Sequence, residues 1–236
     1  MRRLILPLLL AWWGLGAGAG AGADVRLSGF QTMSPALQAM QQDDASNPAM
    51  LWVQAGRELW GQRCASCHQA AQLRGVSARY PVFDAKTARP ITLEGRITAH
   101  QALSTDDLLA VTAFIALQSR GVAITATDDP RLAPFVKEGE HLFKRRMGQL
   151  NLSCAQCHDE RAGLSLGGSS IPQGHSTGYP LYRLEWQTLG NLERRLRNCV
   201  TGVRAAPLKD EELVALELYL KQRAAGMAMD APAVRP

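Results

Sequence analysis

The sequence predicts an all-α fold made of two tandem domains related by internal duplication. Three observations lead to this prediction. The length of 236 residues suits two domains of about 100 residues each. Three blocks of sequence occur twice in the same order. Apolar residues recur at helical spacing, while strand signals are weak.

The formal net charge of +5 is modest. Neither a basic run with interleaved aromatics nor a glycine-rich phosphate loop is present, so we expect no nucleic-acid or nucleotide binding.

The N-terminus has the features of a secretory signal peptide. Two arginines precede an apolar run from Leu4 to Leu15, and small residues follow up to Ala23. The alternative is a membrane anchor, which would need roughly 20 apolar residues. We therefore expect residues 1–23 to be removed on export to the periplasm, leaving no membrane span in the mature protein. Residues 24–45 would form an N-terminal extension.

Each domain is expected to begin with a helix that leads into a Cys-x-x-Cys-His motif. In the first domain, residues 46–128, Asn47 followed by Pro48 is typical of a helix start, and the helix leads into CASCH. The second domain, residues 129–236, repeats this arrangement before CAQCH. Both leading segments contain a glycine, two further residues, a leucine and an aromatic residue. The boundary is expected within residues 121–134, which are rich in threonine, aspartate and proline.

Two later blocks also occur twice. Residues 80–100 match residues 179–199, and residues 107–124 match residues 212–229. In the second pair, leucine and other apolar residues recur at helical spacing, and a glycine follows as a stop signal. Matched blocks in the same order predict that one domain was duplicated.

The two CxxCH motifs predict two covalently bound c-type haems, and hence two cytochrome c-like domains. Two thiols one helical turn apart can bond to the vinyl groups on one edge of the porphyrin, which brings the following imidazole under the iron. A covalently held haem would also add apolar core to a small domain. The residues are Cys64, Cys67 and the proximal ligand His68 for haem 1, and Cys154, Cys157 and the proximal ligand His158 for haem 2.

A Cys-x-x-Cys pair can alternatively form a redox disulfide or bind zinc. Zinc would need further cysteine or histidine residues in matching pairs. A thioredoxin-like disulfide belongs to a βαβ pattern, which is absent from the sequence. The histidine directly after both motifs favours haem.

The sixth ligand of each iron is not expected to be methionine, because no methionine lies between a CxxCH motif and the last helix of its domain. In the first domain His100 is the strong candidate, with an ordinary surface histidine as the alternative. The second domain offers His175 and Cys199. The repeat aligns Cys199 with His100, so we expect haem 1 to be ligated by His68 and His100, haem 2 by His158 and Cys199, and His175 to be solvated.

Cys199 could instead be a small buried hydrophobe or form an intermolecular bridge; an internal disulfide is excluded because haem uses the other four cysteines. A thiolate ligand would favour ferric iron and lower the reduction potential. Such a haem is a poor resting electron carrier, and its liganding sulfur is a nucleophile. We therefore expect the Cys199 sulfur to react.

Arg195 lies four residues before Cys199 on the same face of a predicted helix. Its guanidinium would lower the thiol pKa and bind an oxyanion beside the sulfur. The counterpart in the first domain is Arg96, where no reactive sulfur is expected. Both arginines could therefore be partners of haem propionates, as could Arg194 and Arg197.

The block YPLYRLEWQTLGNLERRLRNCV, followed by ELVALELYLKQRAAGM and the tail APAVRP, resembles the SoxA family, the subunits of the SoxAX cytochromes of bacterial sulfur oxidation. ARYPVFDAKT and LLAVTAFIALQSRG in the first half resemble this family as well. The likeness covers nearly the whole mature chain.

The resemblance implies an L-cysteine S-thiosulfotransferase. Such an enzyme joins thiosulfate oxidatively to a cysteine of SoxY in the SoxYZ carrier and passes two electrons through haem to SoxX and a downstream cytochrome c. It further implies that Cys199 is the axial ligand of the catalytic haem and carries a persulfide, and that Arg195 lines the active site. Dihaem members of the family have a cysteine where this sequence has His100, and other members lack the first haem.

Two further functions fit the haem motifs. One is a non-catalytic dihaem electron shuttle, in which Cys199 is only a ligand. The other is a thiosulfate dehydrogenase that forms tetrathionate. The block around Cys199 favours the thiosulfotransferase.

Overall fold

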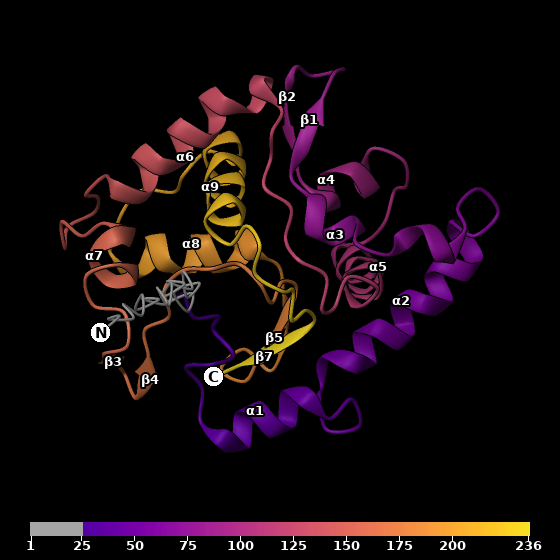
Figure 1. The fold of residues 1–236 in the computed structure, drawn as a ribbon, viewed down its shortest axis with the longest axis horizontal. Helices are drawn as coiled ribbons and strands as arrows, with labels where there is room; N and C mark the ends of the chain where they lie inside the picture. The colour runs from indigo at the N-terminus through magenta and orange to yellow at the C-terminus, as the bar shows by residue number, and fades with distance from the viewer. Residues whose placement is uncertain (1–25) are drawn as a thin grey trace, which may run out of the picture.

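The computed structural model describes residues 26–236, so the signal peptide predicted over residues 1–23 lies outside the described residues. Figure 1 shows two helical halves side by side, the first in purple and magenta and the second in orange and yellow. Helix α1 (Pro35–Gln42) precedes the first half and packs against the C-terminal strand β7 (Ala233–Arg235). No helix among residues 26–236 combines the length and the apolar character needed to cross a membrane.

Helices dominate both halves, as the sequence predicts. The first half contains α2 (Ala49–Arg63), the 3-10 turn η1 (Ala70–Leu73), α3 (Val76–Arg79), β1 (Val82–Asp84), β2 (Arg89–Ile91), α4 (Leu93–Thr98) and α5 (Thr105–Leu117). The second half contains η2 (Pro130–Leu132), α6 (Ala133–Lys144), α7 (Cys154–His158), β3 (Ser165–Leu166), β4 (Ser169–Ser170), β5 (Leu181–Arg183), β6 (Thr188–Gly190), α8 (Leu192–Gly202) and α9 (Asp210–Arg223). The predicted helix start is confirmed, since α2 begins directly after Asn47-Pro48 and the Asn47 side chain accepts a hydrogen bond from the Ala49 N–H at 3.0 Å.

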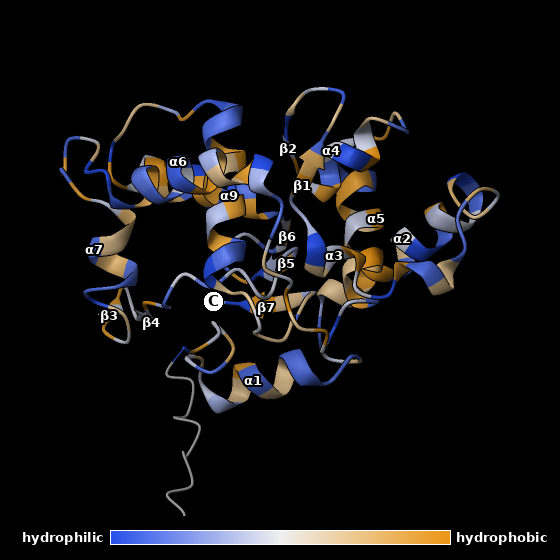
Figure 2. Cartoon of the chain, turned by 45° about the horizontal axis from the view of Figure 1, so that its top comes forward, coloured by the Kyte–Doolittle hydropathy of each residue, from blue (hydrophilic) through white to orange (hydrophobic). Residues whose placement is uncertain are grey.

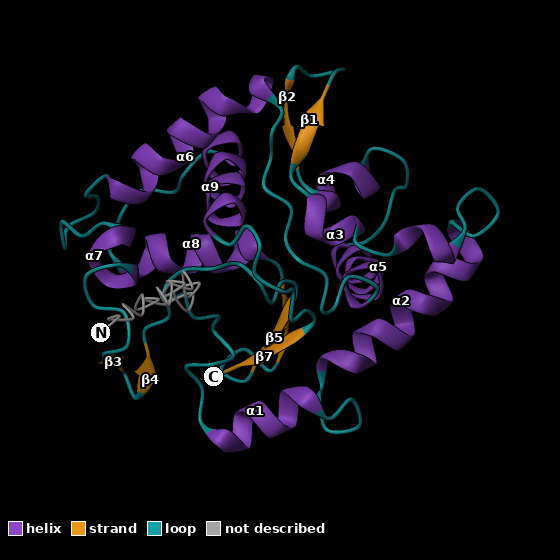
Figure 3. Cartoon of the chain, viewed as in Figure 1, coloured by secondary structure: helices purple, strands orange, loops and turns teal. Residues whose placement is uncertain are grey.

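The all-α prediction needs correction, because short strands accompany the helices (Figure 3). β1 pairs antiparallel with β2, and β5 pairs antiparallel with β6 and parallel with β7. Each of these strands has three residues, too few to show the alternation of apolar and polar residues that marks a strand in a sequence. The hairpin turns contain Ala88 and Gln187 at positive φ (55° and 51°), residue types that do not signal a turn.

The two long helices of each half cross at a glycine. A Cβ atom on Gly56 in α2 would lie 1.9 Å from the carbonyl oxygen of Ala110 in α5, and a Cβ on Gly139 in α6 would lie 2.1 Å from that of Ala215 in α9. Any larger residue would force the helices apart. Figure 2 shows the hydrophobic colouring of α5, whose central residues are buried in the core of the first half. The glycine in each repeated leading segment therefore sets the distance between the two core helices.

The segments that follow α5 and α9 pair with each other across the boundary between the halves. The Ile124 N–H donates to the Met227 carbonyl at 2.8 Å, and the Met229 N–H donates to the Val122 carbonyl at 2.9 Å. In the matched blocks, Ile124 stands opposite Met229 and Val122 opposite Met227. Exchanging the two halves thus exchanges the two hydrogen bonds, so this contact has approximate two-fold symmetry.

A small cavity of about 20 Å³ lies between the halves and is lined by Glu94, Thr112, Glu217 and Lys221 among others. Its volume is enough for one water molecule. The Thr112 hydroxyl is buried and has no hydrogen-bond partner within residues 26–236. Burial, followed by repulsion from Glu94, raises the pKa of Glu217 to about 8, against an opposing effect of the Lys221 ammonium. Two carboxyl groups and one amine therefore share this interface.

The glycine crossing gives a prediction with a control in the same helix. We expect Gly56→Ala to lower the free energy of unfolding by about 1–3 kcal/mol or more, because the new methyl group overlaps the α5 backbone. Gly61, also in α2, has no heavy atom within 4 Å of a built Cβ. Gly61→Ala should raise stability by up to about 1 kcal/mol through helix propensity. Equal effects of the two substitutions in chemical denaturation of the haem-loaded protein would contradict the close crossing.

The carboxyl groups at the boundary predict a pH dependence. The pKa of Glu217 in the folded state, about 8, lies above its ordinary value of 4.5, so folding favours the protonated form. This stabilising contribution is complete below about pH 4.5 and is lost as the pH rises through about 8. Glu217→Gln, which stays neutral, should flatten the fall in stability between about pH 5 and pH 9. The exposed Glu138→Gln on α6 serves as the control. Parallel stability curves for the Glu217 variant and the wild type would refute the shift.

Candidate active site

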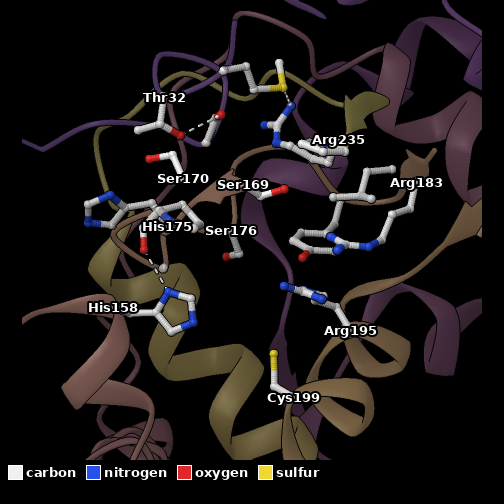
Figure 4. Close-up of a pocket in the computed structure, with 18 of the residues that line it drawn as sticks. Thr32, His158, Ser169, Ser170, His175, Ser176, Arg183, Arg195, Cys199 and Arg235 are labelled. Carbon is white, nitrogen blue, oxygen red and sulfur yellow. Dashed lines mark hydrogen bonds between the residues drawn. The ribbon is translucent and has the colours of Figure 1, made fainter. Parts of the chain in front are cut away.

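A cavity of about 490 Å³ lies in the second half, between α7, α8 and the β3–β4 hairpin (Figure 4). Its volume falls within the roughly 300–1,000 Å³ typical of cofactor and ligand pockets. Both predicted ligands of the haem 2 iron, His158 and Cys199, line this cavity. Cys154, Ser176, Tyr179 and Arg195 line it as well. The structure thus brings Cys154 and His158 of the second CxxCH motif together with Cys199, whereas Cys157 of that motif is not part of the lining.

His158 ends α7, a short helix whose start is fixed by a capping box between Ser153 and Gln156. Its Nδ1 lies 2.7 Å from the carbonyl oxygen of Pro172. Since a carbonyl only accepts, Nδ1 carries the proton and Nε2 keeps its lone pair. Burial lowers the pKa of His158 and favours the neutral ring. A neutral imidazole held through Nδ1, with Nε2 available, is the form that binds a metal.

Cys199 lies on α8, which Asn191 caps at its N-terminus. Leu192, Leu196 and Val200 bury one face of this helix in the core. Cys199 occupies the cavity side, and Figure 4 shows its sulfur below the cavity, across from His158. An imidazole and a thiol from two helices therefore face the same space. Burial raises the pKa of the neighbouring Cys154 thiol to about 11.

Arg195 precedes Cys199 by one helical turn and also lines the cavity. No carboxylate among residues 26–236 forms an ion pair with its guanidinium. Its counterpart Arg96 is different, because Arg96 lies 3.1 Å from the buried carboxylate of Asp84. Hydrogen bonds from Thr87, followed by Arg96, lower the pKa of Asp84. The first half therefore neutralises this arginine internally, whereas the second half leaves the charge of Arg195 to the cavity.

Each half contains a buried polar side-chain atom that has no hydrogen-bond partner among the described residues and that would fit the polar edge of a large cofactor. Ser176 is 2% exposed and its hydroxyl has no hydrogen-bond partner among the described residues, yet it lines the cavity beside His158. In the first half, the buried Trp60 Nε1–H likewise lacks a partner within residues 26–236. Because buried polar groups are nearly always hydrogen-bonded, both atoms point to a partner that is not protein, such as the carboxylate edge of a haem.

The first CxxCH motif lies at the end of α2. Cys64 is buried there, while Cys67 and His68 are exposed, and the His68 ring centroid is 6.0 Å from that of Trp60. His100 follows α4 and is exposed, with Nδ1 2.8 Å from the Arg96 carbonyl oxygen, so Nε2 is again available.

The loop after α4 reaches this motif. Gln101 donates to the Arg63 carbonyl at 3.5 Å, which brings the residue after His100 next to the one before Cys64. The structure therefore brings the segment that carries His100 near the first CxxCH motif.

Several polar lining residues were not singled out from the sequence, among them Ser176, Tyr179, Arg183 and Arg235. Tyr179 could have been found because the Tyr-Pro pair occurs in both matched blocks. Arg183 could have been found because it stands where the first block has Asp84. His175 also lines the cavity, with Nδ1 2.8 Å from the Leu27 carbonyl oxygen, where the sequence suggested a solvated histidine.

A helical chain with CxxCH motifs, and with an available imidazole facing a thiol across a cofactor-sized cavity, defines a c-type cytochrome. The cytochrome c domain of the SoxA/TsdA family matches residues 49–124 and 138–229. The chain belongs to this family, and such a domain implies covalently bound c-type haem.

Relatives support the same assignment. The L-cysteine S-thiosulfotransferase subunit SoxA of Pseudaminobacter salicylatoxidans is 32% identical, with 90% of this chain and 82% of the relative covered. The protein of the same description from Paracoccus pantotrophus is 31% identical, with 90% and 80% covered. The crystal structure of SoxXA from P. pantotrophus matches with a TM-score of 0.84 and 30% identity, covering 89% of this chain and 87% of that chain.

Proposed function

We propose that this protein is the SoxA subunit of an L-cysteine S-thiosulfotransferase. It would join thiosulfate oxidatively to a cysteine of SoxY in the SoxYZ carrier. The observation that carries this proposal is the cavity in which Cys199 lies beside Arg195 and across from His158. The descriptions of the relatives supply the reaction class. SoxX is the proposed partner, in line with the matching SoxXA structure.

The proposed ligand set follows the chemistry of the donors. His158 Nε2 and the Cys199 sulfur would hold the iron of haem 2, whose vinyl groups bond to Cys154 and Cys157. Haem 1 would be held by Cys64, Cys67, His68 and His100. The unpaired Trp60 Nε1–H and the Nδ1 bonding of His100 support a haem at this position.

The residues around haem 2 have two roles: one binds the charged end of the substrate, and the other forms the new bond. When bound, haem accepts electrons one at a time. The Arg195 guanidinium binds the sulfonate oxygens of thiosulfate and brings its terminal sulfur to Cys199. A sulfur–sulfur bond forms between the two, and two electrons leave towards SoxX and a downstream cytochrome c. The carrier thiolate then attacks this bond, takes the sulfane-sulfonate group and releases the Cys199 thiolate.

We further propose that the two halves arose by duplication, with domains at residues 46–128 and 129–236, and that the protein works in the periplasm after removal of residues 1–23. The matching hairpins, the glycine crossings and the exchanged hydrogen bonds between the halves support the duplication. The N-terminal sequence pattern supports export.

The shuttle and the tetrathionate-forming dehydrogenase remain the alternative functions. The unneutralised Arg195 beside the sulfur favours an enzyme that binds an anion over an electron shuttle. The descriptions of the relatives favour the thiosulfotransferase over the dehydrogenase.

Replacing the sulfur tests the proposal. Cys199→Met should keep the covalently bound haem and lower conjugation of thiosulfate to SoxY by more than about 10³-fold, because the nucleophile is lost. Thr201→Ala, at an exposed position on the same helix, is the control. The assay uses the haem-loaded SoxAX complex with intact SoxYZ, and mass spectrometry of SoxY. Full conjugation by the methionine variant would leave the electron shuttle as the better description.

Spectroscopy of the ferric protein tests the ligands separately from the activity. EPR and near-infrared spectra should contain one thiolate-ligated and one bis-histidine low-spin iron. Cys199→Met should remove the thiolate signal alone, and His100→Ala should remove the bis-histidine signal alone. A wild-type spectrum without a thiolate signal would refute the ligation of iron by Cys199.

A further inference from the structure

We propose that Arg183 is a second anion-binding side chain of the large cavity, and that it recognises the sulfonate end of the substrate together with Arg195. This inference rests on the proposed function and adds a specificity-determining residue to it. The chemistry recognised is that of a small, doubly charged sulfur oxoanion.

The position of Arg183 is defined by a comparison of the two hairpins. Asp84 is the last residue of β1 and pairs with Arg89 across the hairpin, while Arg183 is the last residue of β5 and pairs with Thr188. The matched blocks align the same two residues. Arg183 therefore occupies in the second half the place that Asp84 occupies in the first.

This substitution reverses the charge beside the helical arginine. In the first half, the Asp84 carboxylate neutralises Arg96 at 3.1 Å. In the second half, the equivalent pair consists of two guanidinium groups, Arg183 and Arg195, and both line the cavity. Figure 4 shows them on the same side of the cavity, above Cys199. Two like charges on one wall repel each other unless an anion lies between them. The second half can therefore bind an external anion at the place where the first half has the Asp84 carboxylate.

Arg183 forms an ion pair with one carboxylate among residues 26–236, and its guanidinium also lies over the Trp186 ring, 5.5 Å from the ring centre. Its guanidinium lies 2.7 Å from the carboxylate of Glu185 in the hairpin turn, and the Glu185 side chain is 59% exposed. Arg183 and, more weakly, Arg195 lower the pKa of Glu185, so this carboxylate lies in the field of both arginines. Because water reaches the Glu185 carboxylate, its ion pair with Arg183 is weak. An anion entering the cavity can therefore displace Glu185 at little cost.

Arg235, the third arginine in the lining, differs from Arg183. Its guanidinium lies 3.0 Å from Asp230 and donates to Gln41, and both partners are largely buried between α1 and the C-terminal strand. This charge is fixed and already compensated. Arg183 and Arg195 are thus the arginines of the lining whose charge an incoming anion can use.

A haem propionate would offer the same oxyanion chemistry to Arg183. We favour the substrate because Arg183 and Arg195 line the same cavity as Cys199 and lie on the same side of it, where the sulfur substrate must react.

The experiment measures thiosulfate binding to the oxidised, haem-loaded SoxAX complex without carrier, by calorimetry, together with the KM for thiosulfate in the conjugation assay. We expect Arg183→Gln to weaken binding and to raise KM by about tenfold or more, since a charge-assisted hydrogen bond is lost. Arg183→Lys should recover part of the affinity, because it keeps the charge without the fork of donors. Glu185→Gln should strengthen binding about two- to threefold, because a competing anion is removed.

Arg161→Gln is the control, since Arg161 forms an ion pair with an exposed glutamate, Glu160, outside the cavity lining. It should leave binding unchanged. A reduction-potential titration of each variant provides the second measurement. Unchanged thiosulfate affinity in Arg183→Gln overturns the inference, and a shifted haem potential in that case assigns Arg183 to a propionate. Absence of thiosulfate binding to the wild-type complex overturns it as well.

The two proposals fail in different ways. Loss of the proposed function would appear as conjugation by Cys199→Met, with the effect of Arg183→Gln on thiosulfate affinity still measurable. If Arg183 does not bind the substrate, conjugation would still depend on Cys199, while the affinity for thiosulfate would be the same in Arg183→Gln and the wild type.

Discussion

The close approach of helix pairs at Gly56 and Gly139 is the constraint on which the rest of the structure depends. Each glycine brings two long helices to a distance at which backbone meets backbone. The hairpin, the short helix before it and the helix after it then pack around that pair. In the second half this arrangement leaves α7 and α8 on either side of a cavity, with an imidazole from one and a thiol from the other. The chemistry of the site thus follows from the spacing of helices that carry none of its reactive groups.

Electrostatics distinguishes two halves that share this architecture. The first half buries Asp84 against Arg96 and presents no unneutralised charge at that point. The second half has Arg183 and Arg195 at the same positions, and the carboxylate that pairs with Arg183 is an exposed glutamate. A local fold can therefore hold either a closed ion pair or an anion-binding wall, and a single position in a three-residue strand decides which.

The sequence predicts the parts of this site that depend on local spacing. The start of α2 follows from its capping residues Asn47 and Pro48, and the shared cavity side of Arg195 and Cys199 follows from helical periodicity. The strands could not be predicted, because three residues are too few to show an alternation of apolar and polar side chains. The significance of Gly56 also depends on tertiary structure, since only the position of α5 shows why a side chain is excluded.

The arginine at position 183 illustrates a different limit. Its alignment with Asp84 could be read from the matched blocks, but the meaning of the change needed the observation that Asp84 neutralises Arg96. Likewise, the sequence could align His100 with Cys199, whereas the bond from His158 to the Pro172 carbonyl joins residues whose proximity no periodicity predicts.

The hydrogen bonds exchanged between residues 122–124 and 227–229 have a consequence for the origin of the molecule. A contact that maps onto itself under a two-fold rotation is how two identical subunits meet. If the halves descend from one ancestor, a single-haem chain bearing this segment would have been a homodimer. Fusing the subunits turned their association into an intramolecular one, independent of concentration. Selection could then act on each copy alone, which a symmetric dimer encoded by one gene does not allow.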